Sequence, residues 1–469
     1  MKTKKNFMIF TIATLIMLII IYFPSTPEGL NMDAKAALGI LSFAIILWMT
    51  EAIPFPVTGL SLIILLPIFD LTSFKNAAYS GFGNSIIVFF IGIMIMSAAL
   101  TESGFTYRFT LAILNKVGTK TSKLLLVFLS IGAFLSMWVT NMGVAAILLP
   151  IGKEILENSN LKPLKSNFGK GLMISIAWGC GIGGMGTPVG NGANVLAIGF
   201  FKDMANIDIT FIDWMKVGLP SILLLLPLSW IILKKVFPPE IDYLPIKDDY
   251  IHNELEKLGT ITSRERNTII IFAIAIFFWL TNPLIKNYFN MSIPIQSVAL
   301  FAAVTMFLPY IEILNWDKAQ KVINWGAIVL IAGGLSLGEV LFDTGAVKWV
   351  AKTFLYNIGI LALVFRFVAI VAIVQIVKVF FSSNTATGLV VIPIMIALAQ
   401  ELNLNVWLIA GPAALSISLA FLLVPSSPTN VIPYSAGYFS MKDFFISGIW
   451  LSLAGIITIS LTFLIFGSL

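Results

Sequence analysis

Four short polar clusters interrupt apolar segments of the 469-residue sequence at points where a membrane helix would otherwise continue. Two are hydroxyl–asparagine clusters, at 140–142 and 382–385, and two are rich in glycine or proline, at 186–194 and 425–430. Glycine and proline end helices and leave backbone N–H and C=O groups that lipid cannot satisfy. The clusters are therefore predicted to lie inside the protein, around a site that uses those groups.

The chemistry of such clusters is ion binding. Helix N-termini present N–H donors and a partial positive charge, which together attract anions. Carbonyls freed at broken helices suit Na⁺, and Ser, Thr and Asn side chains add hydrogen-bond donors for a carboxylate. A single membrane asparagine more often bonds a neighbouring helix, but the hydroxyl–asparagine pair occurs twice. Two facing copies favour an anion with two carboxylates.

The residue inventory argues against several other classes of protein. Cys180 is the only cysteine and His252 the only histidine, and His252 lies in a polar segment. A Ser-His-Asp or Cys-His catalytic site inside the membrane is therefore excluded, and no phosphate-binding Gly-rich loop with Lys is present for a pump. We expect a carrier rather than an enzyme, with no cofactor except possible Na⁺.

Composition indicates a membrane protein. The chain is 58% hydrophobic and only 11% charged, against about a quarter charged in soluble domains. Its formal charge of +6 does not indicate a nucleic-acid partner, because Lys and Arg lie in short loops beside apolar runs, as positive-inside topology predicts. The lipid bilayer, in the plasma membrane of a bacterium, is the expected environment. The basic segment Met1–Lys5 predicts a cytoplasmic N-terminus.

Apolar runs of spanning length predict an all-α polytopic fold with about 11 transmembrane helices. Two further segments, 122–157 and 361–400, are too long for one span and carry the hydroxyl–asparagine clusters at their centres. We expect each to form a re-entrant hairpin. The predicted spans lie near 7–23, 34–50, 55–71, 84–101, 169–200, 215–236, 266–286, 293–312, 325–341, 405–438 and 443–467.

The two halves of the chain resemble each other. Laying Ser85–Gly104 over Gly326–Gly345 aligns Gly92 with Gly333, and the hydroxyl–asparagine clusters follow in the same order. Five crossings and one hairpin in each half would give an inverted-topology repeat; chance similarity of Leu- and Gly-rich helices is the alternative. The predicted organisation is an N-terminal segment and first helix at 1–30, a first repeat at 31–236 with a broken helix at 169–200, a cytoplasmic linker at 237–265, and a second repeat at 266–469 with a broken helix at 405–438.

Three motifs resemble one family. Residues 50–58, Thr-Glu-Ala-Ile-Pro-Phe-Pro-Val-Thr, look like a signature of the divalent anion/sodium symporter (INDY-type) family. Residues 383–385 match its Ser-Asn-Thr hairpin motif, and 427–430 are similar to its Thr-Pro-Pro-Asn. The resemblance implies a homodimer with an elevator mechanism, in which a transport domain moves against a scaffold. It also implies exchange, or Na⁺-coupled symport, of dicarboxylates such as succinate, malate, fumarate or 2-oxoglutarate.

The resemblance carries functional roles onto individual positions. The implied substrate contacts are Thr140, Asn141, Met142, Ser383, Asn384, Thr385, Ser427 and Pro428. The implied first Na⁺ site comprises Ser136, Thr140, Asn141 and Gly190. The implied second Na⁺ site, which the sequence puts in doubt, comprises Val379, Ser382, Asn384 and Ser426.

Departures from the family pattern are concentrated at the second cation site. Val379 replaces a hydroxyl residue, Phe380 stands where an acidic residue is usual, and Lys378 lies beside them in an apolar run. Met142 removes a hydroxyl from the first tip. A membrane lysine is a functional candidate by default, so we expect Lys378 to act as a tethered cation in place of Na⁺ and to favour dicarboxylate exchange. Snorkelling to an interface is the alternative role for Lys378. Na⁺-coupled symport and, more remotely, an anion channel remain the alternative functions.

Overall fold

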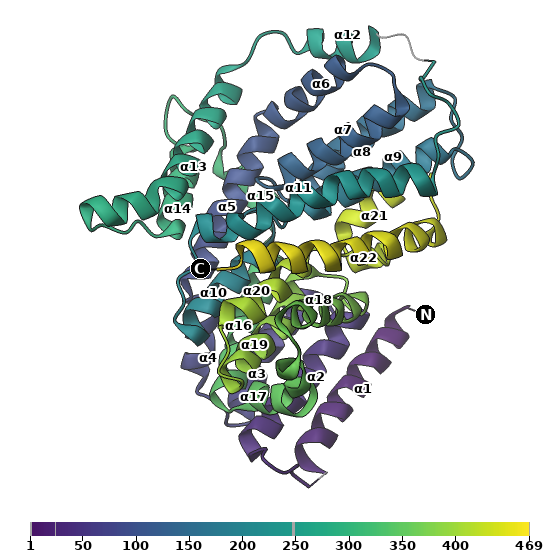
Figure 1. Ribbon diagram of the computed structural model, residues 1–469. Helices are drawn as coiled ribbons and strands as arrows, with labels where there is room; N and C mark the ends of the chain where they lie inside the picture. The colour runs from purple at the N-terminus through teal and green to yellow at the C-terminus, as the bar shows by residue number, and fades with distance from the viewer. Residues whose placement is uncertain (1, 24, 246–248, 469) are drawn as a thin grey trace.

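The computed structural model describes residues 2–23, 25–245 and 249–468, which fold into helices joined by short turns (Figure 1). The predicted all-α fold is confirmed, and no β-strand occurs in the described residues apart from an isolated bridge between Lys120 and Tyr243. Parts of three predicted segments lie outside the described residues: 1 and 24 of the N-terminal segment, 246–248 of the linker, and 469 of the second repeat.

The helices of the first half follow the predicted spans closely, with two additional helices. They are α1 (Lys2–Tyr22), α2 (Met32–Thr50), α3 (Phe55–Ile68), α4 (Phe74–Phe82), α5 (Ser85–Glu102), α6 (Phe105–Val117), α7 (Thr121–Ser136), α8 (Asn141–Asn158), α9 (Asn167–Gly183), α10 (Gly192–Ala205) and α11 (Phe211–Val236). The two additional helices, α4 and α6, were not predicted from the sequence.

The second half repeats this order of elements after the linker helix α12 (Asp249–Lys257). Its helices are α13 (Ser263–Phe289), α14 (Ile295–Thr305), α15 (Trp316–Val322), α16 (Trp325–Asp343), α17 (Ala346–Val350), η1 (Ala351–Leu355), η2 (Tyr356–Ile360), α18 (Leu363–Val379), α19 (Asn384–Glu401), α20 (Val406–Ser416), η3 (Val424–Ser426), α21 (Pro428–Tyr434) and α22 (Met441–Phe466).

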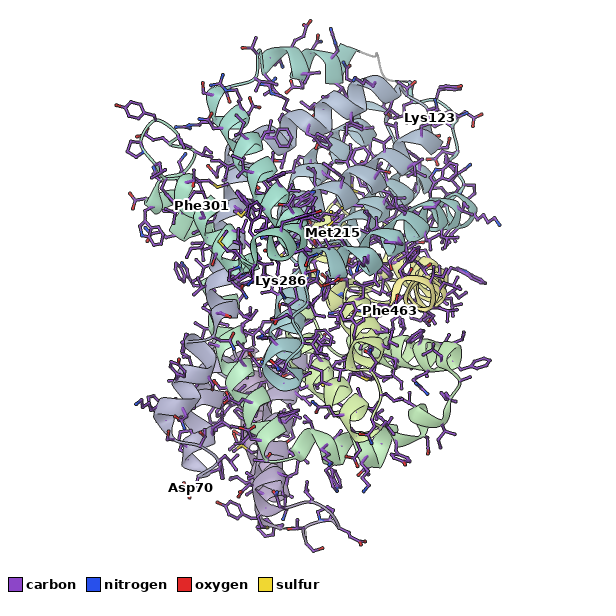
Figure 2. The ribbon with its side chains drawn as sticks, turned by 60° about the vertical axis from the view of Figure 1, so that its left-hand side comes forward. Asp70, Lys123, Met215, Lys286, Phe301 and Phe463 are labelled. Carbon is purple, nitrogen blue, oxygen red and sulfur yellow. The ribbon has the colours of Figure 1, made fainter. Side chains whose placement is uncertain are left out.

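Eight helices of the described chain are long and apolar enough to cross a membrane. Shorter apolar helices such as α3, α14 and α20 account for other predicted spans, so the total of 11 crossings stays a prediction. Many large apolar side chains point outward, among them Phe301 of α14, which is 69% exposed and stands at the edge of the molecule in Figure 2. Such a surface suits lipid rather than water.

Both segments that were too long for one span fold into two helices joined by a short turn. In the first, α7 ends at Ser136 and α8 begins at Asn141; in the second, α18 ends at Val379 and α19 begins at Asn384. In Figure 1, α7, α8 and α9 lie above α11 and α22, while α18, α19 and α20 lie below them. The two hairpins therefore approach the centre of the molecule from opposite sides of α11 and α22.

Packing between the halves is reciprocal. Helix α16 of the second half packs against α3 of the first, and α5 of the first half packs against α14 of the second. The aligned pair Gly92 and Gly333 explains how the backbones approach so closely. A Cβ at Gly333 would strike the carbonyl oxygen of Gly59, and one at Gly92 would lie 3.1 Å from the carbonyl carbon of Ala299. This exchange of partners supports two related halves.

The polar linker between the two halves contacts the start of the first hairpin and helix α6. The backbone N–H groups of Thr121 and Leu244 donate across the bridge to Asp242 and Thr119, at 3.0 Å each. The Arg108 guanidinium bonds Glu265 Oε1 at 2.6 Å and also donates to the linker carbonyls of residues 258–260. Within the described part of the predicted linker, helix α12 thus packs on α6.

Candidate functional site: facing helix tips and two cation positions

A cavity of about 910 Å³ lies where the two hairpin turns and the two broken helices meet. All eight residues predicted to contact substrate line it, together with Gly190 and Ser382 of the predicted cation sites. Its wall is completed by other residues, including Glu51, Phe55, Phe90, Met94, Asn191, Asn324, Leu330 and Ile432. The structure therefore brings together clusters that lie far apart in the sequence.

Each hairpin turn presents the N-terminus of a helix to this cavity. Thr140 is the N-cap of α8, and its hydroxyl accepts from the N–H of Gly143 at 3.3 Å. Ser383 is the N-cap of α19 in the same manner, accepting from Ala386 at 3.3 Å. Because the first N–H groups of a helix lack intrahelical acceptors, both turns offer donors and a partial positive charge to an anion. Asn141 and Asn384 are the first residues of their helices.

The two breaks are held open by a matched pair of asparagines. Asn194 donates its side-chain amide to the carbonyls of Gly184 and Thr187, each at 2.8 Å. Asn430 donates equivalently to the carbonyl of Ala420 at 2.7 Å. Both side chains are buried. Since these amides satisfy carbonyls that the broken helices expose, the Asn194/Asn430 repeat stabilises the breaks rather than lining the cavity.

The predicted first cation position has oxygen atoms suited to a cation. The Oδ1 of Asn141 is buried without a hydrogen-bond partner in the described part of the chain, and the buried Oγ of Ser136 has only the Cys180 thiol, a weak hydrogen-bonding group, beside it. Gly190 is buried beside them, and a Cβ there would lie 2.7 Å from the carbonyl oxygen of Gly184 and 2.9 Å from that of Ser136. Buried acceptors without donors are costly. These residues fit Na⁺, which would satisfy several of them together.

The predicted second cation position holds a cation of the protein itself. The ammonium group of Lys378 donates to the carbonyl oxygen of Ser426 at 2.6 Å and to that of Phe381 at 3.3 Å. Lys378 is 1% exposed, so its side chain reaches inward rather than snorkelling to a surface. Val379 ends α18 beside it and supplies no side-chain oxygen. The Oδ1 of Asn384 is buried without a partner among the described residues.

No role was predicted from the sequence for Glu51 or Asn324. Both line the cavity, and Glu51 is the one charged side chain among its described lining residues. Its carboxylate oxygen accepts a hydrogen bond from the hydroxyl of Ser382. The available signal was the position of Glu51 directly after a predicted span, inside the 50–58 motif. That signal does not reveal which hairpin the carboxylate meets, because the contact spans 331 residues of sequence.

The match to a family model decides the kind of protein. Residues 4–469 match the sodium:sulfate symporter transmembrane region. The chain belongs to this family. The predicted resemblance to divalent anion/sodium symporters is therefore confirmed, as is the expectation of a membrane transporter rather than an enzyme.

Individual relatives agree with this membership. The chain is 30% identical over 452 residues to the sodium-dependent dicarboxylate transporter SdcS of Staphylococcus saprophyticus, covering 93% of this chain and 86% of that protein. It is 29% identical, with the same coverage, to SdcS of Staphylococcus aureus strain USA300.

Solved structures show a similar fold at low identity. The Alcanivorax borkumensis YdaH transporter aligns with a TM-score of 0.61 at 12% identity, covering 90% of this chain and 98% of that one. Neisseria gonorrhoeae MtrF aligns with a TM-score of 0.60 at 11% identity, covering 98% and 94%. This likeness concerns the fold alone.

Proposed function

We propose that this family member exchanges C4 and C5 dicarboxylates, such as succinate, malate, fumarate and 2-oxoglutarate, across a bacterial plasma membrane. The dicarboxylate class rests on the facing helix tips and on the names of the related transporters. The exchange mode rests on one observation: the Lys378 ammonium bonds the carbonyl of Ser426, a residue of the predicted second cation site.

Lys378 favours exchange because its charge is fixed to the protein. No carboxylate forms an ion pair with it among the described residues, and only backbone carbonyls accept its hydrogen bonds. An uncompensated buried charge is expensive to move across a membrane, whereas a bound dianion supplies the missing negative charge. The loaded protein should therefore cross more readily than the unloaded one, and one dicarboxylate would leave only when another returns.

The proposed movement is of the elevator type in a homodimer. Helices α7–α11 and α18–α22 pack chiefly among themselves, as in the contacts of α9 with α7 and α8 and of α22 with α11 and α18. Helices α1–α5 and α13–α16 form the other group, through α1–α2, α3–α16 and α5–α14. We assign the first group to a transport domain and the second to a scaffold, with the N-terminus cytoplasmic.

Liposome counterflow tests the exchange proposal. Vesicles loaded with unlabelled succinate should take up labelled succinate without a Na⁺ gradient, and vesicles without internal dicarboxylate should not. Lys378→Ala removes the uncompensated charge that holds back the unloaded protein, so vesicles without internal dicarboxylate should now take up labelled succinate, on the order of 100-fold faster than with the parent. Lys352→Ala, at an exposed lysine of η1, is the matched control and should behave like the parent. Equal uptake by Lys378→Ala and the parent into vesicles without internal dicarboxylate would refute the tethered-cation role.

Na⁺-coupled symport is the second candidate, favoured by the first cation position. The buried Oγ of Ser136 and Oδ1 of Asn141 offer a place for Na⁺ that Lys378 does not reach through any described hydrogen bond. Uptake into vesicles that lack internal dicarboxylate, driven by an inward Na⁺ gradient, would establish symport. Saturation of either flux with rising succinate would argue against an anion channel.

A further inference from the structure

The chemistry of Glu51 is unexpected for an anion site. It is the only charged residue among the described residues that line the cavity, and its charge is negative. A carboxylate there opposes a dianion by simple repulsion, worth several-fold to tenfold in affinity at a few ångströms even in a partly wet cavity. Its presence therefore calls for a role other than substrate binding.

The position of Glu51 is fixed by its backbone. It is the C-cap of α2, with φ of 49°, and its N–H donates to the carbonyl of Leu47 at 2.9 Å. Pro54 caps the next helix only three residues later. The carboxylate is therefore carried on a short turn between α2 and α3, and α2 and α3 pack against each other and against α16.

The partner of Glu51 lies on the other structural group. Ser382 belongs to the second hairpin turn, directly before Ser383 and Asn384, and its hydroxyl donates to the Glu51 carboxylate. A hydrogen bond to an ionised acceptor is roughly twice as strong as one between neutral groups. This contact joins the turn that would bind an anion to a helix of the proposed scaffold.

We propose that Glu51 is a scaffold-borne latch that holds the second hairpin turn through Ser382, and that a bound dianion releases it. This inference rests on the proposed function, because it assigns the two partners to groups that move apart. A carboxylate of the substrate at Ser383-Asn384 competes for donors of the same turn and repels Glu51. Glu51 thereby selects against a third negative charge and ties movement to occupancy of the turn.

Glu51 is not a carrier of a coupled proton or cation. A co-transported ion must travel with the substrate, and Glu51 lies on the group proposed to stay fixed. The chain also offers no group of three or more acidic, His or Cys residues near it that would hold a metal, within the residues described. Because Glu51 lies on the proposed scaffold, it can act only at the stage of the transport cycle in which the second hairpin turn lies beside it.

Binding measurements on the purified full-length protein test the latch. Glu51→Gln keeps an acceptor for Ser382 but removes the charge, so succinate should bind about tenfold tighter, as measured by calorimetry. Monomethyl succinate, with a single negative charge, should gain about half that effect on a logarithmic scale. Ser382→Ala removes the contact and leaves the charge, so both ligands should tighten by similar, smaller factors of about threefold.

The controls separate the latch from the proposed function. Glu312→Gln changes another exposed glutamate at positive φ that does not line the cavity, and it should bind like the parent. Failure of the parent itself to bind succinate would overturn the proposed function. If the parent binds succinate but Glu51→Gln binds it with the same affinity, the latch is refuted while the transport proposal stands. Equal gains for succinate and its monomethyl ester would likewise refute repulsion as the means of release.

Discussion

The first and second hairpin turns share a backbone plan but differ in how they treat positive charge. Each places a hydroxyl N-cap and an asparagine at the start of a helix facing the cavity. Beneath the first, Ser136 and Asn141 present buried oxygens. Beneath the second, Lys378 already donates to the carbonyls of Phe381 and Ser426. The first position offers oxygens to an exchangeable cation, whereas the second is already occupied by the amine of Lys378.

Under the proposed function, the two turns keep one anion-binding plan and differ in how a cation is supplied. Backbone N–H groups at helix termini do not depend on side-chain identity, so the anion-binding plan survives substitution. A cation position depends on a few oxygens and on local charge. In the proposed function a single lysine, Lys378, takes the place of an ion without disturbing the helix tip at 382–385, four to seven residues later.

The largest expected effect tests whether the two turns serve one substrate. Asn141→Ala and Asn384→Ala should each lower succinate exchange by on the order of 100-fold, since each removes a polar contact of about 2–3 kcal/mol from a preorganised site. Na⁺ should modulate the residual flux of Asn384→Ala only, because Asn141 also belongs to the first cation position. Asn158→Ala, at the exposed far end of α8, is the control. Identical Na⁺ responses in Asn141→Ala and Asn384→Ala would show that the two turns do not differ in their use of Na⁺.

A smaller effect is expected at the first cation position alone. Gly190→Ala would place a Cβ 2.7 Å from the carbonyl oxygen of Gly184 and fill the space among the oxygens. Any stimulation of transport by Na⁺ should fall about tenfold, and flux without Na⁺ should stay within about threefold of the parent. Flux measured at increasing Na⁺ concentrations separates the loss of Na⁺ stimulation from any loss of Na⁺-independent flux. Unchanged Na⁺ stimulation would show that the cation binds elsewhere.

Removing one oxygen should have a milder consequence than filling the position. Ser136→Ala deletes a buried hydroxyl whose one recorded neighbour is the Cys180 thiol. The Na⁺ concentration for half-stimulation should therefore rise roughly fivefold, equivalent to about 1 kcal/mol. Protein stability should be nearly unchanged, which a thermal melt in detergent would check. A large loss of stability with no change in Na⁺ response would make Ser136 a packing residue.

The smallest effect is expected from a substitution that makes the first turn more like the second. Met142 lines the cavity where the second turn has Thr385, and Met142→Thr restores a hydroxyl to the first. Succinate affinity should rise about threefold, in keeping with one net hydrogen bond of roughly 0.5–1 kcal/mol. Competition binding would measure it. A fall in affinity would mean that the methionine side chain itself packs on the substrate.

Much of the candidate site was predictable because its polar residues interrupt long apolar segments. Hydroxyl–asparagine pairs and Gly/Pro clusters are conspicuous in apolar sequence, and all eight predicted substrate contacts line one cavity. Helices α4, α6, α12, α15 and α17 were not predicted. Amphipathic helices such as α6 and α12 are stabilised by packing on other parts of the chain, here on each other.

The sequence by itself determined the membrane setting, the helical class and the identity of the polar turns, because hydrophobic length and helix-breaking residues act locally. Only the tertiary structure decided which carbonyls Lys378 meets and that Glu51 faces Ser382. Those contacts join residues 48 and 331 positions apart. Periodicity and composition carry no information over such distances, since close approach there depends on how whole helices pack.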